Sequence, residues 1–418
     1  MPKRGKRPIE NGDDAADIEN NNTKKVKTEV THECYGTQVG CVLTLGEGDT
    51  GQLGLGPDVL ERNKPALVPG LDNVVQVCAG GMHNVCLTKD GKVVTFGCND
   101  EGGLGRPTSD DDPESDPGDV QISEKIVLVS AGDSHSAALS TAGQVYIWGT
   151  FRDANGPIGL IEPNKIEKTP VKVMEDEVVV KISSGADHLV ALTNKGEIFT
   201  MGNAEQGQLG RVAECFSYRG GRKGLEFFLT PARVTCRKRK ALFVDVWSGT
   251  YTTYAKEQTG KIYAWGLNNY FQLGFKDITN RFVPEIVKSF DPKRQWKAME
   301  GGQHHTIALD ESGKVHCVGR AEYGRLGIGE NVTEKNSPQL VGVLAEKKTV
   351  NVSCGTATSF AVLDSGLLYC WGMGTSRQLG DADEEDQWEP VQLTGKQISE
   401  RKVISASAGG QHLIILAS

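Results

Sequence analysis

The sequence predicts an all-β protein, a β-propeller of seven blades with four strands in each blade. Two observations lead to this prediction. A glycine-centred motif recurs seven times along the chain, and the partial repeats at the two chain ends complete one another. Radial repetition of short antiparallel sheets leaves only short, protected strand edges. Length alone points elsewhere, since 418 residues would ordinarily make two or three domains.

Each repeat begins with a small residue, a glycine, two variable residues and a histidine or threonine. Successive glycines of this motif are 52, 53, 64, 53, 53 and 54 residues apart. This period is longer than the roughly 40 to 45 residues of tryptophan-aspartate propellers, whose Trp-Asp signature is also missing. The anchors of the seven repeats are Gly80, Gly132, Gly185, Gly249, Gly302, Gly355 and Gly409.

Strand periodicity follows the anchors. Eleven residues after each of the first six anchors stands a second glycine, such as Gly143, which suits a tight hairpin turn with positive φ. Between Gly143 and Trp148 the residues alternate as in a half-buried strand. An apolar residue and a glycine end this strand, and in six repeats a Leu-Gly pair follows eight residues later. We therefore expect units of four short strands and little helix.

The two chain ends predict that the array closes into a ring. The chain enters with the second half of a repeat, from Leu45 to Gly54, and finishes with the first half of one, from Gly409 to Leu416. An open array does not need complementary halves, but a ring does. We therefore predict one propeller domain over residues 36–418, in which the last segment pairs with the first.

Composition narrows the class of protein. The ten cysteines have irregular spacings without a Cys-x-x-Cys pair, which is typical of reduced thiols in an intracellular protein. No apolar run approaches the roughly 18 residues of a membrane helix, so we expect no membrane partner. The net charge of -8 argues against a nucleic-acid groove that covers the whole surface, although local basic patches are compatible with it.

Residues 1–35 are predicted to be a disordered tail because they carry almost no large apolar side chains. Two basic clusters flank an acidic middle. Such clusters are typical of signals bound by a nuclear import receptor and of segments that bind DNA, and a merely soluble tail is the alternative. The basic residues are Lys3, Arg4, Lys6, Arg7, Lys24, Lys25 and Lys27.

One repeat has a longer loop than the others. Gly149 and Gly159 are ten residues apart, whereas the corresponding glycines of the other six repeats are eight apart. The tripeptide Asn155-Gly156-Pro157 near its tip is turn chemistry that would stiffen the loop. One enlarged loop marks a single place on the ring, which is either a binding element or a tolerated insertion.

The spacing between the anchor glycines Gly185 and Gly249 is also unusual, since its 64 residues are eleven more than in the neighbouring repeats. It is rich in arginine, whose guanidinium group suits clusters of carboxylates. A site for an acidic protein surface and a solvated basic loop are both compatible with this composition. The basic residues are Arg219, Arg222, Lys223, Arg233, Arg237, Lys238, Arg239 and Lys240.

The repeated motif places histidines and aspartates around the mouth of the predicted channel. These residue types could form a metal or acid–base site. They are spread over five blades, however, so we predict no metal and no cofactor. For His135, His188 and His305 we expect hydrogen bonds that hold the blades. The whole set comprises His83, Asp133, His135, Asp187, His188, His304, His305 and His412.

The repeat resembles that of the regulator-of-chromosome-condensation family. The resemblance rests on the period, the Gly-x-x-His start, the Trp-Gly pair and stretches such as LTLGEGDTGQLGLG, FGCNDEGGLGR and GGQHHT, and it covers essentially everything after the tail. It implies a nuclear, chromatin-associated guanine-nucleotide exchange factor that acts on the GTPase Ran without making covalent bonds. Propellers of this family also serve as ubiquitin-ligase modules, a photoreceptor and a β-lactamase inhibitor, so a scaffold without exchange activity is the alternative.

The resemblance also implies roles for particular residues. Asp187, Asp133 and His304 would promote nucleotide release, Asp187 most strongly. The face that meets Ran would also include Asp49, His83, Arg211 and His412. On the opposite side, Arg219, Arg222 and Lys223 would bind the acidic patch of nucleosomal histones, and the tail would bind DNA. The enlarged loop resembles the family's wedge, which pushes against the GTPase beside its phosphate-binding loop, and comprises Phe151, Arg152, Asp153, Ala154, Asn155, Gly156, Pro157 and Ile158.

Overall fold

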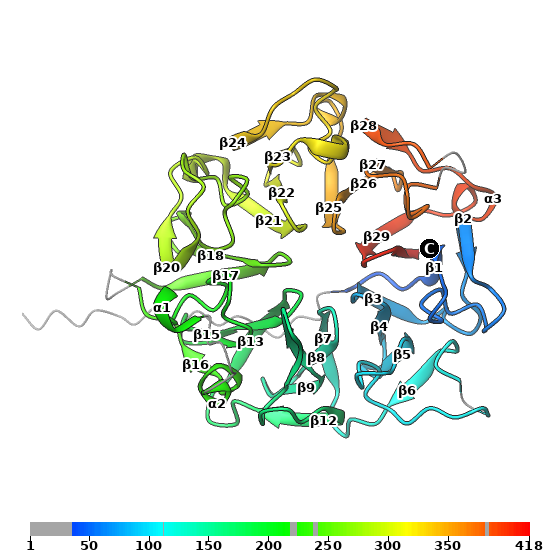
Figure 1. Ribbon diagram of the computed structural model, residues 1–418. Coiled ribbons are helices and arrows are strands. Elements are labelled where there is room, and N and C mark those ends of the chain that lie inside the picture. The colour runs from blue at the N-terminus through cyan, green and yellow to red at the C-terminus, as the bar shows by residue number, and fades with distance from the viewer. Residues whose placement is uncertain (1–35, 112, 218–223, 237–240, 381–383) are drawn as a thin grey trace, which may run out of the picture.

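The computed structural model describes residues 36–111, 113–217, 224–236, 241–380 and 384–418. These residues form seven four-stranded antiparallel sheets around a central channel, together with one two-stranded hairpin (Figure 1). The structure confirms the all-β, seven-bladed propeller that the glycine period predicts.

Six blades consist of strands that follow one another along the chain, with the first strand of each blade lining the channel (Figure 1). Their strands are β3 (Val74–Ala79), β4 (His83–Thr88), β5 (Val93–Gly97) and β6 (Gly118–Val120); β7 (Ile126–Ala131), β8 (His135–Ser140), β9 (Val145–Gly149) and β12 (Glu167–Val173); β13 (Val179–Ser184), β14 (His188–Thr193), β15 (Ile198–Gly202) and β16 (Ala232–Arg233); β17 (Phe243–Ser248), β18 (Thr252–Glu257), β19 (Ile262–Gly266) and β20 (Arg281–Ile286); β21 (Trp296–Gly301), β22 (His305–Asp310), β23 (Val315–Gly319) and β24 (Lys335–Leu340); β25 (Thr349–Cys354), β26 (Thr358–Leu363), β27 (Leu368–Gly372) and β28 (Gln387–Gln392).

The seventh blade is built from both ends of the chain, as the two half-repeats predict. Strands β29 (Val403–Ala408) and β30 (His412–Ala417) pair with β1 (Cys41–Glu47) and β2 (Glu61–Leu67). The register of β1 on β30 runs from Cys41 opposite Ala417 to Gly46 opposite His412. Backbone hydrogen bonds between the two ends therefore close the ring.

Helices are few and short in the described residues. They are α1 (Glu214–Ser217), α2 (Leu225–Leu229) and α3 (Lys396–Ser399), with the 3-10 turns η1 (Pro292–Arg294), η2 (Glu322–Gly324) and η3 (Gly342–Leu344). None of the helices in this part of the chain is long and apolar enough to cross a membrane.

The anchor glycines are required by the close approach of neighbouring blades. A Cβ atom on Gly132 would lie 2.1 Å from Cε1 of His135 and 2.5 Å from the carbonyl oxygen of Gly185 in the next blade. Backbone bonds link the blades at the same level, since Asp133 N donates to Ala186 O at 2.8 Å. Any larger residue at the anchor would push two blades apart, which explains why glycine recurs.

Tryptophans fill the space between blades. Trp148, Trp265 and Trp371 are fully buried, and each ring nitrogen donates to a backbone carbonyl of the preceding blade at 2.8, 2.8 and 3.1 Å. A buried indole needs such a partner for its N–H group. These rings are therefore packing residues.

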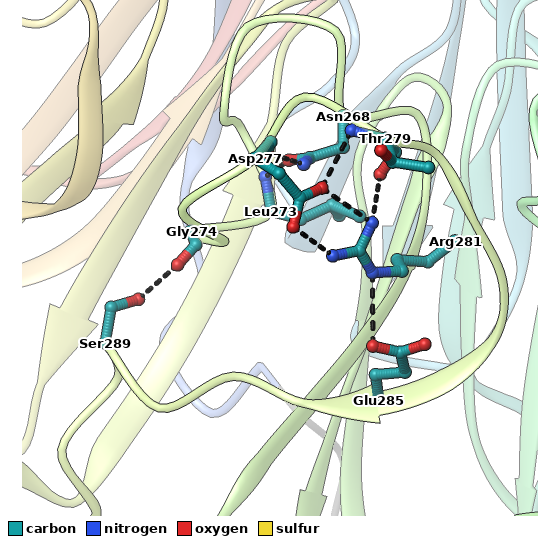
Figure 2. Close-up of polar contacts among 8 residues, drawn as sticks. All are labelled: Asn268, Leu273, Gly274, Asp277, Thr279, Arg281, Glu285 and Ser289. Carbon is teal, nitrogen blue, oxygen red and sulfur yellow. Dashed lines mark hydrogen bonds and ion pairs between the residues drawn. The ribbon is translucent and has the colours of Figure 1, made fainter.

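Most loops between the third and fourth strands of a blade, which we call outer connections, are held by their own polar side chains. Figure 2 shows the connection between β19 and β20. Asn268 accepts from Leu273 N at 3.1 Å and donates to the Asp277 carbonyl at 2.6 Å, while Arg281 binds both carboxylate oxygens of Asp277 at 2.8 and 3.0 Å. The hydrogen bonds from Arg281 lower the pKa of Asp277 to about 2.

Several sequence predictions lie outside the described residues. The tail of residues 1–35 is one of them, with its basic clusters of Lys3, Arg4, Lys6, Arg7, Lys24, Lys25 and Lys27. Two parts of the long insertion are the other. Residues 218–223, which include Arg219, Arg222 and Lys223, and residues 237–240, which are Arg237, Lys238, Arg239 and Lys240, lie outside the described residues.

Candidate partner-binding face

The loops that carry the predicted site lie at one end of the propeller. In each blade the third strand ends opposite the start of the second, as where Gly149 pairs with His135. Outer connections therefore emerge beside the turns between first and second strands. Asp133, Asp187 and His304 lie in those turns, and the enlarged loop and Asp49 lie in outer connections. The structure thus gathers most of the predicted residues on one face, which we call the turn face.

The enlarged loop is a β-hairpin with a buried base. Strands β10 (Phe151–Asp153) and β11 (Gly156–Gly159) pair with Arg152 opposite Pro157. Phe151 and Ile158 are 0% and 1% exposed and belong to the core between blades. Of the eight residues that the resemblance assigns to the wedge, Phe151 and Ile158 are therefore core residues at its base. Only residues 152–157, the wedge tip, are accessible.

Asp187 holds the base of this hairpin. Its Oδ1 accepts a hydrogen bond from Arg152 N at 2.7 Å, and the side chain is only 7% exposed. Removal from water raises the pKa of Asp187 well above its ordinary value, and the nearby charge of Asp133 raises it further. On the same side, Asn203 Nδ2 donates to Arg152 O at 2.8 Å. The wedge backbone is thus fixed by the following blade.

Two glutamates that the sequence reasoning missed also bind the wedge tip. Glu101, from the preceding blade, forms an ion pair with the guanidinium of Arg152. Glu205, from the following blade, accepts from Ala154 N at 3.3 Å. A signal for them exists in the repeat, because each lies three or four residues beyond the glycine that ends a third strand, Gly97 or Gly202.

His304 has the surroundings of a neutral, accessible imidazole. It is partly buried, its Nδ1 lies 3.2 Å from Asn269 Oδ1, and its ring packs edge-on against Tyr270 at 4.8 Å. Burial, with the charges of Arg325 and Arg320, lowers the pKa of His304 to about 4. Near pH 7 this side chain therefore presents hydrogen-bonding groups without a positive charge. Asp133 and Asp49 are exposed on the same face.

His83 and His412 do not belong to the accessible surface, contrary to the prediction. They are 2% and 0% exposed. Nε2 of His83 lies 2.7 Å from Ser136 Oγ, and Nε2 of His412 lies 2.9 Å from Asn84 Oδ1. Each is the first residue of a second strand, where its ring points into the junction with the next blade. Neither can contact a partner while the blades are closed.

The expected hydrogen bonds of the other repeated histidines are present in two of three cases. His188 Nε2 lies 2.9 Å from Thr253 Oγ1, and His305 Nε2 lies 2.8 Å from Ser359 Oγ. For His135 the expected bond to a side chain of the next blade is absent among the described residues. Its ring packs instead against Phe151, with centroids 4.6 Å apart.

Arg211 is a structural residue rather than part of the turn face. Its guanidinium donates to the carbonyls of Phe227, Phe228 and Thr230 at 3.0 to 3.2 Å, which are the free carbonyls at the end of α2. Burial lowers the pKa of Arg211 to about 10, so it stays charged at pH 7. The sequence could not show this role because the helix was not predicted.

The described part of the long insertion begins and ends against the middle of β15. It starts at Arg211, whose Nε donates to Thr200 O in the middle of β15 at 3.3 Å, and it ends at β16, which pairs with the same part of β15. Both the insertion and the wedge are outer connections, in neighbouring blades. The insertion thus leaves from the outer rim of its blade.

Within the described residues, no group of three or more histidine, cysteine or acidic side chains is placed to hold a metal ion.

The fold and the turn face define a class of protein, a propeller of glycine-anchored repeats that carries a hairpin held by acidic residues. The family model of the RCC1-like domain matches residues 41–415, and the chain belongs to the regulator of chromosome condensation family. It is 51% identical over 398 residues to "Regulator of chromosome condensation" of Mus musculus, covering 94% of each chain. It is 30% identical over 430 residues to "Guanine nucleotide exchange factor SRM1" of Saccharomyces cerevisiae, covering 88% of this chain and 86% of that one.

Solved structures of relatives have the same fold. Prp20p of Saccharomyces cerevisiae, described with its binding properties to Gsp1p and histones, superposes with a TM-score of 0.84 at 27% identity over 94% of each chain. The complex of Kap60 with yeast RCC1 (Prp20) superposes with a TM-score of 0.83 at 27% identity, over 99% of this chain and 96% of that one.

Proposed function

We propose that this protein is a guanine-nucleotide exchange factor that binds the GTPase Ran and accelerates the release of GDP. The name of the Saccharomyces cerevisiae relative and the description of Prp20p support this proposal. The observation that carries it to this chain is the wedge, which among the described residues is the outer connection that forms a two-stranded hairpin, and which Asp187 fixes through a hydrogen bond of 2.7 Å.

Exchange of this kind involves no covalent chemistry and no cofactor. The factor binds the nucleotide-free GTPase better than the loaded one, and by linkage the nucleotide weakens the factor's hold to the same degree. An acceleration of about 100,000-fold requires that the barrier to release fall by roughly 7 kcal/mol. A single contact does not supply this free energy, so a broad docking face must hold the complex while the wedge acts.

Different residues of the turn face would have different roles in the release of GDP. The wedge tip, residues 152–157, would press against the GTPase beside its phosphate-binding loop. The exposed Asp133 would place a carboxylate where the phosphates and their magnesium ion were held, which disfavours the loaded state, while Asp187 would hold the wedge backbone through Arg152 N. His304, neutral at pH 7 because its pKa is about 4, would contribute hydrogen bonds without attracting phosphate.

The test is release of fluorescent GDP from Ran with three forms of the protein. Replacing residues 152–157 by two glycines keeps Phe151 and Ile158 in the core, so the fold should persist while acceleration is lost. Asp187→Ala should lower the maximal rate more than it lowers affinity for nucleotide-free Ran. If the unaltered protein fails to accelerate release, or the shortened hairpin releases GDP equally fast, the proposal is wrong.

We also propose that the protein works on chromatin in the nucleus. The described histone binding of Prp20p and its complex with Kap60 support this, together with the basic composition of the tail and of the insertion. Arg219, Arg222 and Lys223 would bind the acidic surface of histones, and the tail would bind DNA and an import receptor. Nucleosome binding that survives Arg219→Ala, Arg222→Ala and Lys223→Ala together would contradict the role of the insertion.

A further inference from the structure

Three outer connections are tied to the next blade by one repeated, uncharged set of hydrogen bonds. At the first of them the Gly103 carbonyl accepts from Ser136 Oγ and from Trp148 Nε1, both at 2.8 Å, and Ser136 also bonds His83 Nε2 at 2.7 Å. The second set joins His188, Thr253, Trp265 and the Gln208 carbonyl, and the third joins His305, Ser359, Trp371 and the Arg325 carbonyl. These groups are buried, so salt and pH near neutrality have little effect on them.

The wedge is an outer connection where apolar residues replace this set. Leu189 stands opposite Met201 in the register, where the three junctions described above pair Ser136 with Trp148, Thr253 with Trp265 and Ser359 with Trp371. An apolar pair also occupies this position in the blade built from both chain ends, where Leu45 stands opposite Leu413, but no hairpin forms in the described residues of the preceding outer connection. Neither Leu189 nor Met201 can donate to a carbonyl. In the described part of the structure, His135 consequently has no side-chain partner for either ring nitrogen, although it is fully buried.

Carboxylates take the place of the missing bonds. Asp187 and Glu205 accept from the backbone amides of Arg152 and Ala154 at 2.7 and 3.3 Å, and Glu101 pairs with the Arg152 guanidinium from the other side. In the pair between Arg152 and Glu101 the side chains are 41% and 21% exposed. Ionic strength and incoming charged groups can therefore weaken this attachment, unlike the buried neutral sets.

We propose that Glu101 and Glu205 are positioning residues for nucleotide exchange. From the two blades that flank the wedge, they hold the Arg152 side chain and the Ala154 amide in the orientation with which the exposed tip enters the GTPase. This inference rests on the proposed exchange function and adds two residues to it. Glu101 acts through Arg152, so its effect requires that arginine.

The experiment compares Glu101→Gln and Glu205→Gln with the matched control Glu124→Gln. Glu124 forms a similar ion pair with Lys172 at 2.8 Å, with side chains 28% and 40% exposed, away from the wedge. Amide hydrogen exchange of residues 152–154 is measured on the protein alone, and kcat and KM are measured for release of fluorescent GDP from Ran.

We expect faster amide exchange in residues 152–154 and a kcat about tenfold lower in both variants, with KM unchanged within twofold, a loss that equals about 1.4 kcal/mol of barrier. Glu124→Gln should match the unaltered protein. Arg152→Gln combined with Glu101→Gln should lose no more activity than Arg152→Gln alone. Additive losses, or variants that match the control in both measurements, would overturn the proposal. If the unaltered protein releases no GDP, the exchange function fails, and unchanged amide protection in the variants would then overturn the positioning role as well.

Discussion

The hydroxyl group of Thr253 allows a sharp test of how neighbouring blades are tied. It is buried, lies 2.9 Å from His188 Nε2, and donates to the Gln208 carbonyl at 3.0 Å. Valine has a similar shape without the hydroxyl. Thr253→Val therefore removes two hydrogen bonds with little change in volume, and it leaves Nε2 of His188 without its hydroxyl partner.

The expected loss of stability follows from these contacts. Each hydrogen bond contributes about 1 kcal/mol net, and a buried imidazole left without a partner costs about 1–3 kcal/mol. The Gln208 carbonyl keeps its bond from Trp265 at 2.8 Å, which limits the damage there. We expect the free energy of unfolding to fall by about 2–3 kcal/mol. For the roughly 370 described residues the unfolding entropy is about 0.8 kcal/mol/K, so Tm should fall by about 3 °C.

Thr349→Val is the matched control. Thr349 is 2% exposed, and its Oγ1 has no hydrogen-bond partner in the described part of the chain. Its replacement should leave stability unchanged or slightly higher, because a buried hydroxyl without a partner is already unfavourable. Urea unfolding followed by tryptophan fluorescence, with calorimetry, measures both variants. Equal losses in the two variants would refute the assignment of stability to this hydrogen-bond set.

Three further predictions concern pH and charge. Between pH 6.5 and 5.5 each buried histidine with a low folded pKa, such as His188 at about 3, should lower the free energy of unfolding by about 1 kcal/mol, because only the unfolded imidazole takes up a proton. A urea midpoint that is flat over this range would contradict it. Arg211→Leu should lower the free energy of unfolding by about 2 kcal/mol, measured by thermal unfolding, and leave affinity for nucleotide-free Ran within twofold. A loss of affinity at unchanged stability would show instead that Arg211 contacts Ran. The pKa of Asp277 is about 2, so its pair with Arg281 stabilises the fold above pH 4 and is lost toward pH 2. Because solvent screens the pair, Asp277→Asn should cost less than about 1 kcal/mol at pH 7, and a larger loss in urea unfolding would show a role beyond this ion pair.

The fold could be predicted because its determinants are local and repeat. A Cβ atom on Gly132 would lie 2.1 Å from a histidine ring, so the blade junction itself demands glycine at that spacing. Counting such glycines counts the blades. The insertion was also visible as a longer step, but α2 and its contact with Arg211 were not, because a five-residue helix leaves no periodic signal.

The site could be predicted only in part. The unusual length of the hairpin and the position of Asp187 were visible in the sequence, and the structure joins them by a bond of 2.7 Å. Glu101 escaped notice because it lies 51 residues before Arg152, in another blade. The resemblance assigns His83 to the binding face, and the sequence does not show that Ser136 of the next blade lies 2.7 Å from its ring.

The sequence by itself determined the number of blades, the closure by the chain ends and the blade that differs, because sterically required glycines at a fixed period need no knowledge of the partner blade. Only the tertiary structure decided which histidines and acids are accessible. His304 and His305 are neighbours in the chain, yet one is partly exposed on the turn face and the other is fully buried against Ser359. Exposure and hydrogen bonding at each position depend on the adjacent blade, about one repeat away, and the chain order of similar residues does not contain that information.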